Sequence, residues 1–431
     1  MLGTLDKSRK EATVVGAGIA GMLAAYALDR NGYRVTLIEQ EQRAGGLIRT
    51  SKTKHGIAES AAHSLIATEA VRDLCSELGV TLIEPRPEAK AKFIVRDGKL
   101  RRFPLSVSET FGALRHAAFT RAEAGKQNLE TLDSWARRHL GRAALDYLLT
   151  PFVRGIYGAQ PAELGVAAAY PALNVPAGKT LLGAAISRKR PHTADKKTKK
   201  ATKQRVAPRL GMGDLVAKLE ERLEQRLGSR FRKNETICDV PDAANLIIAT
   251  PAYAASKILA AVSPQMAAQL ATVKYTPIVS ATVFVAKDSF TRPVHGTGVL
   301  MPACEDRKSL GILFNSSSFD YRVSDDAQIA SFTIMMGGTV QRHWLHADDD
   351  EIRQAIKLEL FEVLGIREPL AVVIHRWPAA LPQYSSDLPG VWQYARNTWC
   401  ATPGKILFGN YTGQISLRGM IESASAFAGD S

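Results

Sequence analysis

Hydrophobic and polar positions in the first forty residues follow the pattern of a strand, a helix and a second strand. Residues 12–15 form a short apolar run, which indicates a buried strand. Residues 19–31 repeat apolar side chains at helical spacing, and Gly32 ends that helix. Residues 34–38 form a second apolar run. A strand–helix–strand unit of this kind predicts an α/β fold built on a parallel sheet.

The rest of the chain mixes helical and strand patterns and shows no internal repeat. Apolar residues three and four apart predict helices over residues 69–78, 105–118, 129–149, 211–227 and 351–364, and a last helix that reaches residue 428. Apolar and β-branched runs predict strands over residues 245–249, 278–286, 310–315, 330–336 and 405–408. Residues 104–186 are therefore expected to be mainly helical, and residues 272–340 to be rich in strands.

The chain carries a marked excess of positive charge. It has 56 Lys and Arg residues against 42 Asp and Glu, a formal net charge of +14. Such a balance suggests acidic partners: nucleic acid, anionic lipid or polycarboxylate substrates. Much of the excess is local, because residues 187–209 hold ten Lys or Arg and one Asp. Residues 187–205 have almost no large apolar side chain and no interleaved aromatics, which predicts a disordered linker rather than a nucleic-acid site.

The cysteines and the lengths of the apolar runs indicate the cellular compartment of the protein. The four cysteines, Cys75, Cys238, Cys304 and Cys400, form no zinc-binding pattern, so free thiols in a reducing compartment are expected. The N-terminal residues carry charges where a signal peptide needs an apolar core. No run reaches the roughly 18 apolar residues of a spanning helix. We expect a cytoplasmic protein, which can also lie peripherally on the inner face of the cell membrane.

A glycine-rich turn, Gly16-Ala17-Gly18-Ile19-Ala20-Gly21, joins the first strand to the first helix. In a dinucleotide-binding unit the first glycine permits the tight turn, the second lets the backbone approach a pyrophosphate, and the third lets helix and strand pack closely. The helix N-terminus adds N–H donors and a partial positive charge. Glu39 ends the second strand, where a carboxylate can accept hydrogen bonds from ribose hydroxyls. Together these residues predict a dinucleotide site.

Two further glycine-rich segments make FAD the expected dinucleotide. Arg43, Gly45 and Gly46 follow the acidic strand end, an arrangement that resembles the amine oxidase-like flavoproteins. Residues 409–413 place a second glycine-rich turn between a strand and a helix. The N-terminus of that helix can stabilise negative charge on a reduced flavin ring.

Motifs along nearly the whole chain resemble the protoporphyrinogen oxidase family, whose members are FAD-dependent enzymes that aromatise protoporphyrinogen IX. The order and combination of these motifs carry the resemblance, since single pieces occur in other flavin amine oxidases. Besides the first glycine turn and Glu39, the matching segments are residues 43–50, 58–60, 154–158, 211–215, 296–302, 310–319, 335–338, 375–377, 381–384, 409–417 and 420–424.

The resemblance implies a three-part architecture. A Rossmann-type, discontinuous FAD-binding domain would comprise residues 1–85, 206–262 and 385–431. A β-rich substrate-binding domain would comprise residues 86–103 and 263–384. A helical, membrane-docking domain would comprise residues 104–205, including the basic loop.

The resemblance also implies the site residues. Those expected to contact FAD are Gly16, Ala17, Gly18, Ile19, Ala20, Gly21, Glu39, Gln40, Arg43, Gly45, Gly46, Leu47, Ala61, Ala62, His63, Ser64, Ile237, Gly413, Gln414, Ile415, Ser416 and Leu417. Those expected to line the tetrapyrrole pocket are Gly298, Leu300 and Met335, for which core packing is the plainer alternative. We identify no catalytic acid or base and no metal site.

The chain departs from the family pattern in two places. The family usually has Glu-x-Gly-Pro before the isoalloxazine, and here Glu59 is followed by Ser60-Ala61-Ala62-His63-Ser64. Ser108 falls where a basic residue often pairs with a substrate propionate. Arg101 or Arg102 could substitute, since a guanidinium binds a carboxylate bidentately, although two surface arginines near an anionic membrane explain them equally well.

The expected reaction is the oxidation of protoporphyrinogen IX to protoporphyrin IX in heme biosynthesis, with oxygen as acceptor. The closest alternative is the same chemistry on coproporphyrinogen III, which carries two more propionates. Another flavin oxidase would want an aromatic cage, for which Tyr411 is the obvious candidate. The least favoured alternative is a non-catalytic FAD-binding protein. Expected partners are the porphyrinogen and a membrane surface. A homodimer is compatible with the sequence, and no nucleic-acid partner is expected.

Overall fold

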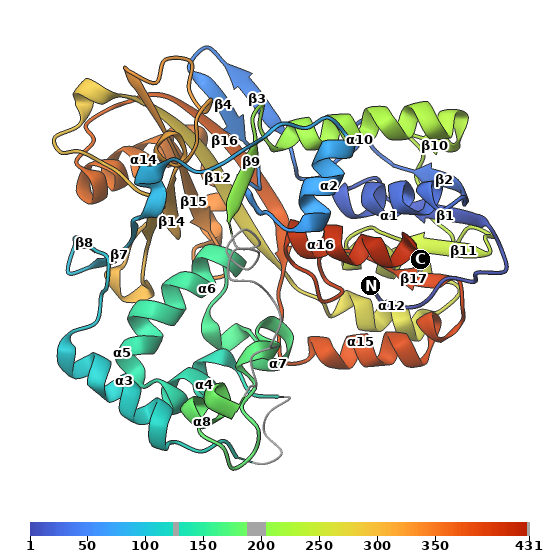
Figure 1. Ribbon diagram of the computed structural model, residues 1–431, viewed down its shortest axis with the longest axis horizontal. Coiled ribbons are helices and arrows are strands. Elements are labelled where there is room, and N and C mark those ends of the chain that lie inside the picture. Colours follow the sequence, from blue (N-terminus) through green and yellow to red (C-terminus); the bar gives the residue numbers. More distant parts are fainter. Residues whose placement is uncertain (124–128, 188–203, 429–431) are drawn as a thin grey trace.

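The computed structural model describes residues 1–123, 129–187 and 204–428. A five-stranded parallel sheet lies on the right of Figure 1, in the order β10-β2-β1-β11-β17. Its strands are β1 (Glu11–Val15), β2 (Arg34–Ile38), β10 (Phe231–Arg232), β11 (Asn245–Ile248) and β17 (Lys405–Leu407). The predicted strand–helix–strand unit is confirmed, with α1 (Ile19–Arg30) between β1 and β2.

Alternate side chains of this sheet enter two separate cores. One core packs Val14, Leu37 and Ile247 against α1, α2 (Glu69–Glu77), α10 (Met212–Leu227) and α16 (Leu417–Ala424). The other packs Leu246 and Ile248 against α11 (Ala252–Leu259), α12 (Pro264–Ala271) and α15 (Leu388–Asn397). Burial on both faces explains why these strands are continuous apolar runs. The predicted domain boundary at residue 262 falls between α11 and α12, which share one core, and the next strand along the chain begins at Tyr275.

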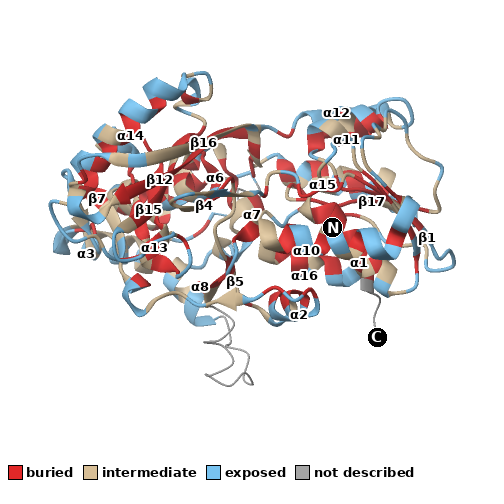
Figure 2. Ribbon diagram, turned by 90° about the horizontal axis from the view of Figure 1, so that it is seen from above, coloured by how far each residue is buried: buried red, intermediate tan, exposed pale blue. Residues whose placement is uncertain are grey.

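A mixed seven-stranded sheet lies on the left of Figure 1, in the order β16-β12-β15-β14-β13-β7-β8. Its strands are β7 (Lys92–Arg96), β8 (Lys99–Arg101), β12 (Tyr275–Ala286), β13 (Gly298–Leu300), β14 (Gly311–Phe314), β15 (Ile329–Gly337) and β16 (Pro369–Pro382). One face packs Val283, Ile312 and Ile334 against α14 (Asp349–Leu364). Figure 2 shows buried residues running through the strands of both sheets.

The segment of residues 107–187 is mainly helical. It contains α3 (Val107–Phe119), α4 (Leu132–His139), α5 (Arg142–Ala144), the π-helical turn η2 (Leu145–Leu149), α6 (Thr150–Tyr157), α7 (Val166–Ala169) and α8 (Leu181–Ser187). The single helix predicted over residues 129–149 is wrong. Gly141 has a φ of +79° and separates α4 from α5, a conformation that ends a helix and favours glycine.

Short ribbons connect the sheets. They are β3 (Thr50–Thr53) with β4 (Gly56–Glu59), and β9 (Arg205–Pro208) between β5 (Leu65–Ile66) and β6 (Leu82–Ile83). The predicted disordered loop over residues 187–205 lies mostly outside the described residues, but its two ends are corrected. Ser187 ends α8, and Arg205 begins β9 because its backbone pairs with Ile66. One residue of the basic stretch is therefore part of the folded core.

The 3-10 turns complete the described elements. They are η1 (Pro87–Lys90), η3 (Pro161–Glu163), η4 (Pro171–Leu173), η5 (Gly228–Arg230), η6 (Lys287–Ser289), η7 (Ala303–Glu305), η8 (Arg342–Leu345), η9 (Trp399–Ala401) and η10 (Ser425–Ala428). A four-residue helix, α13 (Asn315–Ser318), follows β14. Because α13 follows β14, Asn315 and Ser318 lie at the side of the seven-stranded sheet that faces the short strands β4 and β9.

Candidate functional site

The turn between β1 and α1 leaves open space beside the start of the helix. A Cβ added to Gly16 would lie 2.9 Å from Thr250 Cγ2, and one added to Gly21 would lie 1.8 Å from the carbonyl oxygen of Gly16. Packing therefore requires glycine at both positions. Gly18 differs, because its φ of −60° suits any residue and an added Cβ meets nothing within 4 Å. The protein itself leaves room at Gly18, at the helix N-terminus where a phosphate group binds favourably.

The second glycine loop contacts the first. The Gly45 N–H donates to the Ala17 carbonyl at 2.8 Å, and a Cβ on Gly46 would lie 3.4 Å from Gly18 Cα. Arg43 holds this loop, because its guanidinium donates to the carbonyls of Ala44 at 2.8 Å and Ile48 at 3.1 Å. The structure thus brings the predicted glycines together and gives Arg43 a positioning role.

Glu39 lies at the rim of the same turn. Its Oε2 accepts from the Ala17 N–H at 2.6 Å, and its Oε1 accepts from the Glu41 N–H at 3.0 Å. The Glu39 carbonyl accepts from the Glu235 N–H at 3.0 Å, which brings the half-buried Ile237 segment beside β2. Gln40 is exposed. The carboxylate, Ile237 and the glycine turn therefore lie around one end of the five-stranded sheet.

Residues 59–64 run from β4 to β5 and join the two sheets. Glu59 is 4% exposed, and its carboxylate accepts from Thr50 Oγ1 at 2.6 Å and from the Met212 N–H at 2.8 Å. Burial raises the pKa of Glu59, and these two hydrogen bonds act in the opposite direction. The Ser60 carbonyl accepts from Trp377 Nε1, on β16, at 2.7 Å.

The Gly-Pro pair of the family is not needed for this backbone path. None of residues 59–64 has a positive φ, so Ser60, Ala61 and Ala62 adopt it without strain. His63 follows, and its Nε2 is buried without a hydrogen-bond partner among the described residues. Burial, with Arg322 and His375 nearby, lowers the pKa of His63 to about 4. His63 is therefore neutral near pH 7.

The C-terminal turn brings a second helix N-terminus to this region. Gly413 has a φ of +101°, and an added Cβ meets nothing within 4 Å. Ser416 caps α16, since its Oγ accepts from the Gly419 N–H at 3.1 Å. Gln414 is exposed, Ile415 and Leu417 are half-buried, and α16 packs against α1 in one core. The two predicted glycine-rich turns thus belong to helices that lie together in Figure 1.

The side of the seven-stranded sheet opposite α14 carries buried polar groups among apolar side chains, and we call it the polar face after these groups. It carries Ser280, Thr282, Thr333 and His375, which the strand register places on neighbouring positions. The Oγ of Ser280, Oγ1 of Thr282 and Nδ1 of His375 are buried without a hydrogen-bond partner among the described residues. Buried polar groups normally have partners. Buried polar atoms without partners fit a site in which a polar ligand, such as a flavin ring, completes the hydrogen bonds.

The predicted substrate residues lie on the same face. Leu300 pairs with Gly311, and Gly311 pairs with Met335, so the three form one row across β13, β14 and β15. The next row begins with Gly298 beside Leu313. A Cβ on Gly155, in α6, would lie 2.6 Å from Leu300 Cδ2, so glycine permits the close approach of α6. Leu300 and Met335 are both only partly buried.

Arg101 and Arg102 lie elsewhere. Both are exposed, at β8 on the edge of the seven-stranded sheet. Arg102 lines a surface pocket with Glu88, Lys90 and Lys92, not the polar face. The site residues predicted from the sequence do not include Arg154, Arg205 or Arg322, which are buried or half-buried arginines near the predicted site. Arg154 NH1 donates to the Met301 carbonyl at 3.0 Å, and its place in the matching segment 154–158 was the available signal.

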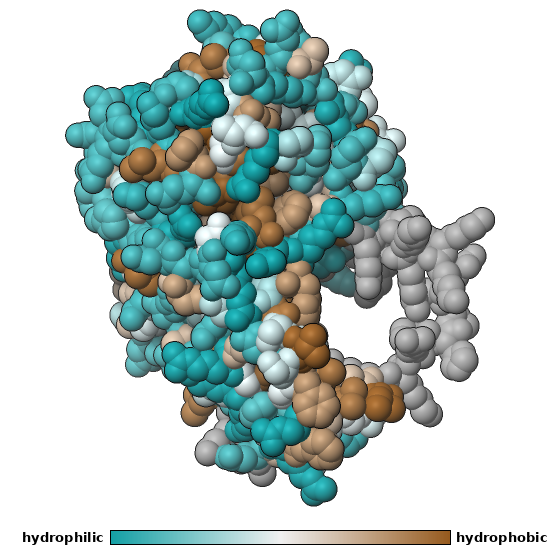
Figure 3. Space-filling model, turned by 90° about the vertical axis from the view of Figure 1, so that its left-hand side faces the viewer, coloured by the Kyte–Doolittle hydropathy of each residue, from teal (hydrophilic) through white to brown (hydrophobic). Residues whose placement is uncertain are grey.

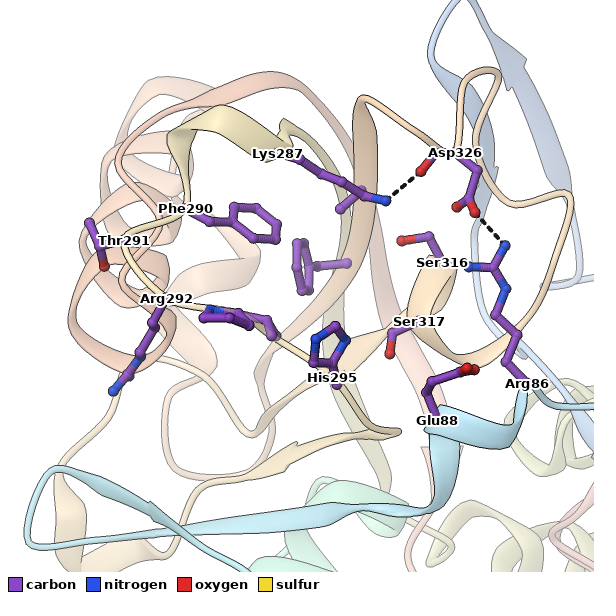
Figure 4. Close-up of a pocket in the computed structure, with 14 residues that line it drawn as sticks. Arg86, Glu88, Lys287, Phe290, Thr291, Arg292, His295, Ser316, Ser317 and Asp326 are labelled. Carbon is purple, nitrogen blue, oxygen red and sulfur yellow. Dashed lines mark hydrogen bonds and ion pairs between the residues drawn. The ribbon is translucent and has the colours of Figure 1, made fainter.

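A larger pocket of about 580 Å³ lies on the other side of the β-rich region (Figure 4). Phe290 and Phe332 line its apolar wall, and two basic side chains on its rim, Arg86 and Lys287, bond to Asp326. Arg86 NH2 contacts Asp326 Oδ2 at 2.6 Å, and Lys287 donates to the Asp326 carbonyl. No expected FAD or substrate residue lines it. The described residues also contain no group of three His, Cys, Asp or Glu that could hold a metal.

Comparisons with known proteins agree with this geometry. A model for flavin-containing amine oxidoreductases matches residues 19–426. Protoporphyrinogen oxidase 2 of Arabidopsis thaliana is 27% identical over 96% of this chain and 92% of its own length. A solved structure from Exiguobacterium sp., provisionally described as a protoporphyrinogen oxidase, has a TM-score of 0.75 at 20% identity, covering 99% and 98% of the two chains.

A structure with another activity shares the fold. Cyclohexylamine oxidase from Brevibacterium oxydans has a TM-score of 0.69 at 16% identity, with 97% of this chain and 98% of that chain covered. Fold alone therefore does not choose the substrate. The family match covers nearly the whole chain, and the open glycine turns with the unpartnered polar groups fit a flavin dinucleotide. The chain belongs to the flavin-containing amine oxidoreductase family, and its cofactor is FAD.

Proposed function

We propose that this protein oxidises protoporphyrinogen IX to protoporphyrin IX, with oxygen as the electron acceptor. The observation that carries the proposal is the row of Leu300, Gly311 and Met335 on the polar face. We assign the apolar side chains of this row to one face of the flat macrocycle. The row adjoins the segment of residues 59–64 through the Trp377–Ser60 hydrogen bond. The 27% identity to a plant protoporphyrinogen oxidase over 96% of this chain supports the same substrate.

The position of Tyr411 argues against an amine substrate. An aromatic cage would need this ring to face the substrate wall, on the polar face. Tyr411 is instead 1% exposed and packs in the core that contains α11, α12 and α15. The Tyr411 carbonyl accepts from Trp392 Nε1 at 2.8 Å, which holds this segment in place. Tyr411 is thus a core residue in this chain.

The residues of the chain bind and orient the substrate. The glycine turns around Gly18 and Gly413 would hold FAD, which would supply a two-electron acceptor for hydride from a methine-bridge carbon. Removal of six electrons takes three such oxidations, with oxygen taking two electrons from the cofactor after each. Each oxidation releases one pyrrole N–H proton to water, and tautomerisation completes the aromatic ring. Leu300 and Met335 exclude water from the reacting face. No side chain is required as a base, and neutral His63 contributes no charge.

A parallel assay tests this proposal. Flavin-loaded protein should produce porphyrin fluorescence from protoporphyrinogen IX in air, with a smaller kcat/KM for coproporphyrinogen III and no oxidation of cyclohexylamine. A larger kcat/KM for coproporphyrinogen III would show that coproporphyrinogen III, and not protoporphyrinogen IX, is the preferred substrate. Bound flavin with no porphyrin formed from either compound would contradict the enzyme assignment.

We also propose that the helical segment docks on an anionic membrane surface. In α3, Val107, Phe111 and Leu114 are 89%, 70% and 62% exposed, and their spacing places them on one side of the helix. Leu182 and Ile186 of α8 are 50% and 75% exposed. Figure 3 shows hydrophobic side chains gathered on the lower part of the molecule.

Positive charge lies beside this apolar surface. Arg115 is exposed on α3, and Arg101 and Arg102 are exposed in the segment before it. Basic residues beside an apolar face attract anionic headgroups. None of the described helices is long and apolar enough to cross a bilayer. The proposed contact is therefore peripheral.

Replacing both Phe111 and Leu114 with aspartate should weaken binding to vesicles of phosphatidylglycerol and phosphatidylcholine. Burying each side chain contributes about 1.5–3 kcal/mol, so the loss should be at least about 100-fold. Leu358→Asp is the control, because Leu358 is 49% exposed on α14, away from this surface. Co-sedimentation of the double variant at the level of the unchanged protein would overturn the docking proposal.

A further inference from the structure

A small cavity of about 60 Å³ between the seven-stranded sheet and the short strands β4 and β9 is lined by two basic side chains that have no role in the proposed reaction so far. Arg205 reaches it from β9, and Arg322 from the loop before β15. Both guanidinium groups lie against the ring of Phe319, at 5.3 Å and 5.7 Å from its centroid. Two positive groups therefore share one wall.

The guanidinium group of Arg322 is incompletely paired among the described residues. Arg322 is 4% exposed, and its NH2 donates to the Pro208 carbonyl at 2.7 Å. Its Nε and NH1 are buried without a hydrogen-bond acceptor among the described residues. The nearest carboxylate oxygen, Glu59 Oε1, is 3.6 Å from NH1. Buried donors without acceptors are costly, so this arrangement is suited to a further acceptor.

The other groups around the cavity do not cancel this charge. The Glu59 carboxylate already accepts from Thr50 and from the Met212 N–H. His63 is neutral near pH 7, because its pKa is lowered to about 4 by burial and by nearby Arg322 and His375. Asn315 donates its amide to Thr333 Oγ1 at 2.9 Å. Two guanidinium groups thus face one carboxylate, which leaves the cavity electropositive.

The cavity lies where the expected cofactor and substrate segments meet. His63 and Ser64 line it from the segment expected beside the flavin, and Leu313 lines it from β14. Leu313 pairs with Gly298, one row from Leu300 and Met335. A group entering this cavity would therefore extend from a molecule that lies on the polar face.

We propose that Arg205 and Arg322 bind a propionate carboxylate of the porphyrinogen in this cavity. The inference rests on the proposed function and names its substrate-binding charge. A volume of 60 Å³ holds about four water-sized groups, which suits a carboxylate with the methylene beside it and excludes the macrocycle. A guanidinium pairs with a carboxylate through two parallel hydrogen bonds. Ser108 carries no positive charge, and the exposed Arg101 and Arg102 do not lie on this face. Arg205 and Arg322 supply the positive charge for the propionate instead.

The test removes one of the two charges and compares ligands with and without carboxylates. Arg205→Gln is preferred to a change at Arg322, which also holds the Pro208 carbonyl. Arg209→Gln is the matched control, because Arg209 lies four residues further on, is exposed, and stacks on Tyr321 at 4.1 Å. The measurements are flavin content, KM and kcat for protoporphyrinogen IX and its dimethyl ester, and the Kd of protoporphyrin IX from tryptophan fluorescence.

For Arg205→Gln we expect a KM and a porphyrin Kd raised about tenfold for the free acid, as for one lost charge-assisted hydrogen bond. The values for the ester, kcat and flavin content should stay unchanged, and Arg209→Gln should match the unchanged protein. Equal values for the free acid in Arg205→Gln and the unchanged protein would overturn the proposed carboxylate site. If the unchanged protein oxidised neither compound, the proposed function would fail first, and the porphyrin Kd would show separately whether Arg205 binds the carboxylate.

Discussion

Replacing Gly18 with glutamate is expected to abolish FAD binding while leaving the fold intact. An added Cβ at Gly18 meets nothing within 4 Å, and the φ of −60° is open to any residue. The new side chain would therefore occupy the open space at the start of α1 and place a negative charge where the pyrophosphate is expected. Loss of two charge-assisted hydrogen bonds alone corresponds to about 100-fold weaker binding. Flavin absorbance after gel filtration and a titration with FAD measure the effect.

Gly390→Glu provides the control for this change. Gly390 lies in α15, is exposed, and also has nothing within 4 Å of an added Cβ, so it tests the introduced charge without touching the turn. It should retain one FAD per chain. Circular dichroism and the thermal midpoint of the FAD-free protein should agree among both variants and the unchanged chain. Stoichiometric FAD in Gly18→Glu would show that the pyrophosphate does not bind at this turn.

Replacing Glu59 with leucine is expected to lower the free energy of unfolding by about 3–5 kcal/mol, because it removes one partner of a buried charged pair. The change leaves the Met212 N–H and Thr50 Oγ1 without their acceptor, and it leaves Arg322 without its nearest carboxylate at 3.6 Å. Glu59→Gln keeps an oxygen for the Met212 N–H and should cost less. Urea unfolding of the FAD-free protein measures both values.

Glu221→Leu is the matched control for the loss of an ion pair. Glu221 contacts Lys218 at 3.0 Å on the surface of α10, with 55% of its side chain exposed. A surface pair of this kind contributes about 0–1 kcal/mol. Equal destabilisation by Glu221→Leu and Glu59→Leu would show that Glu59 does not join β4, α10 and the Arg322 loop as described.

Local chemistry explains which parts of the fold could be predicted. The first strand–helix–strand unit was predictable because its strands are buried on both faces and its turn needs glycine at Gly16 and Gly21 for steric reasons that any such turn shares. The loop at Gly45 and Gly46 was predictable for the same reason. The helix over residues 69–78 is confirmed as α2 (Glu69–Glu77), since three- and four-residue spacing sets a helix locally.

Long-range packing explains what could not be predicted. The break at Gly141 depends on a positive φ that the helical spacing around it conceals. Strand β16 (Pro369–Pro382) contains three prolines, and its apolar residues run on both sides of His375 and Arg376, so it does not alternate like a half-buried strand. Arg205 stands in a basic stretch and Arg322 in no motif, and only the pairing of β9 with β5 and the Phe319 ring bring them to one cavity. The polar face likewise exists only once five strands are in register.

FAD held between the two glycine turns is expected to accept electrons from a porphyrinogen lying on the polar face. The visible absorption of the bound flavin, recorded when the loaded protein is mixed with protoporphyrinogen IX in the absence of oxygen, measures this transfer. The oxidised flavin spectrum should disappear in one turnover, and admission of air should restore it together with porphyrin fluorescence. A flavin spectrum that stays oxidised with both protoporphyrinogen IX and coproporphyrinogen III would show that no electrons pass from a porphyrinogen to the flavin.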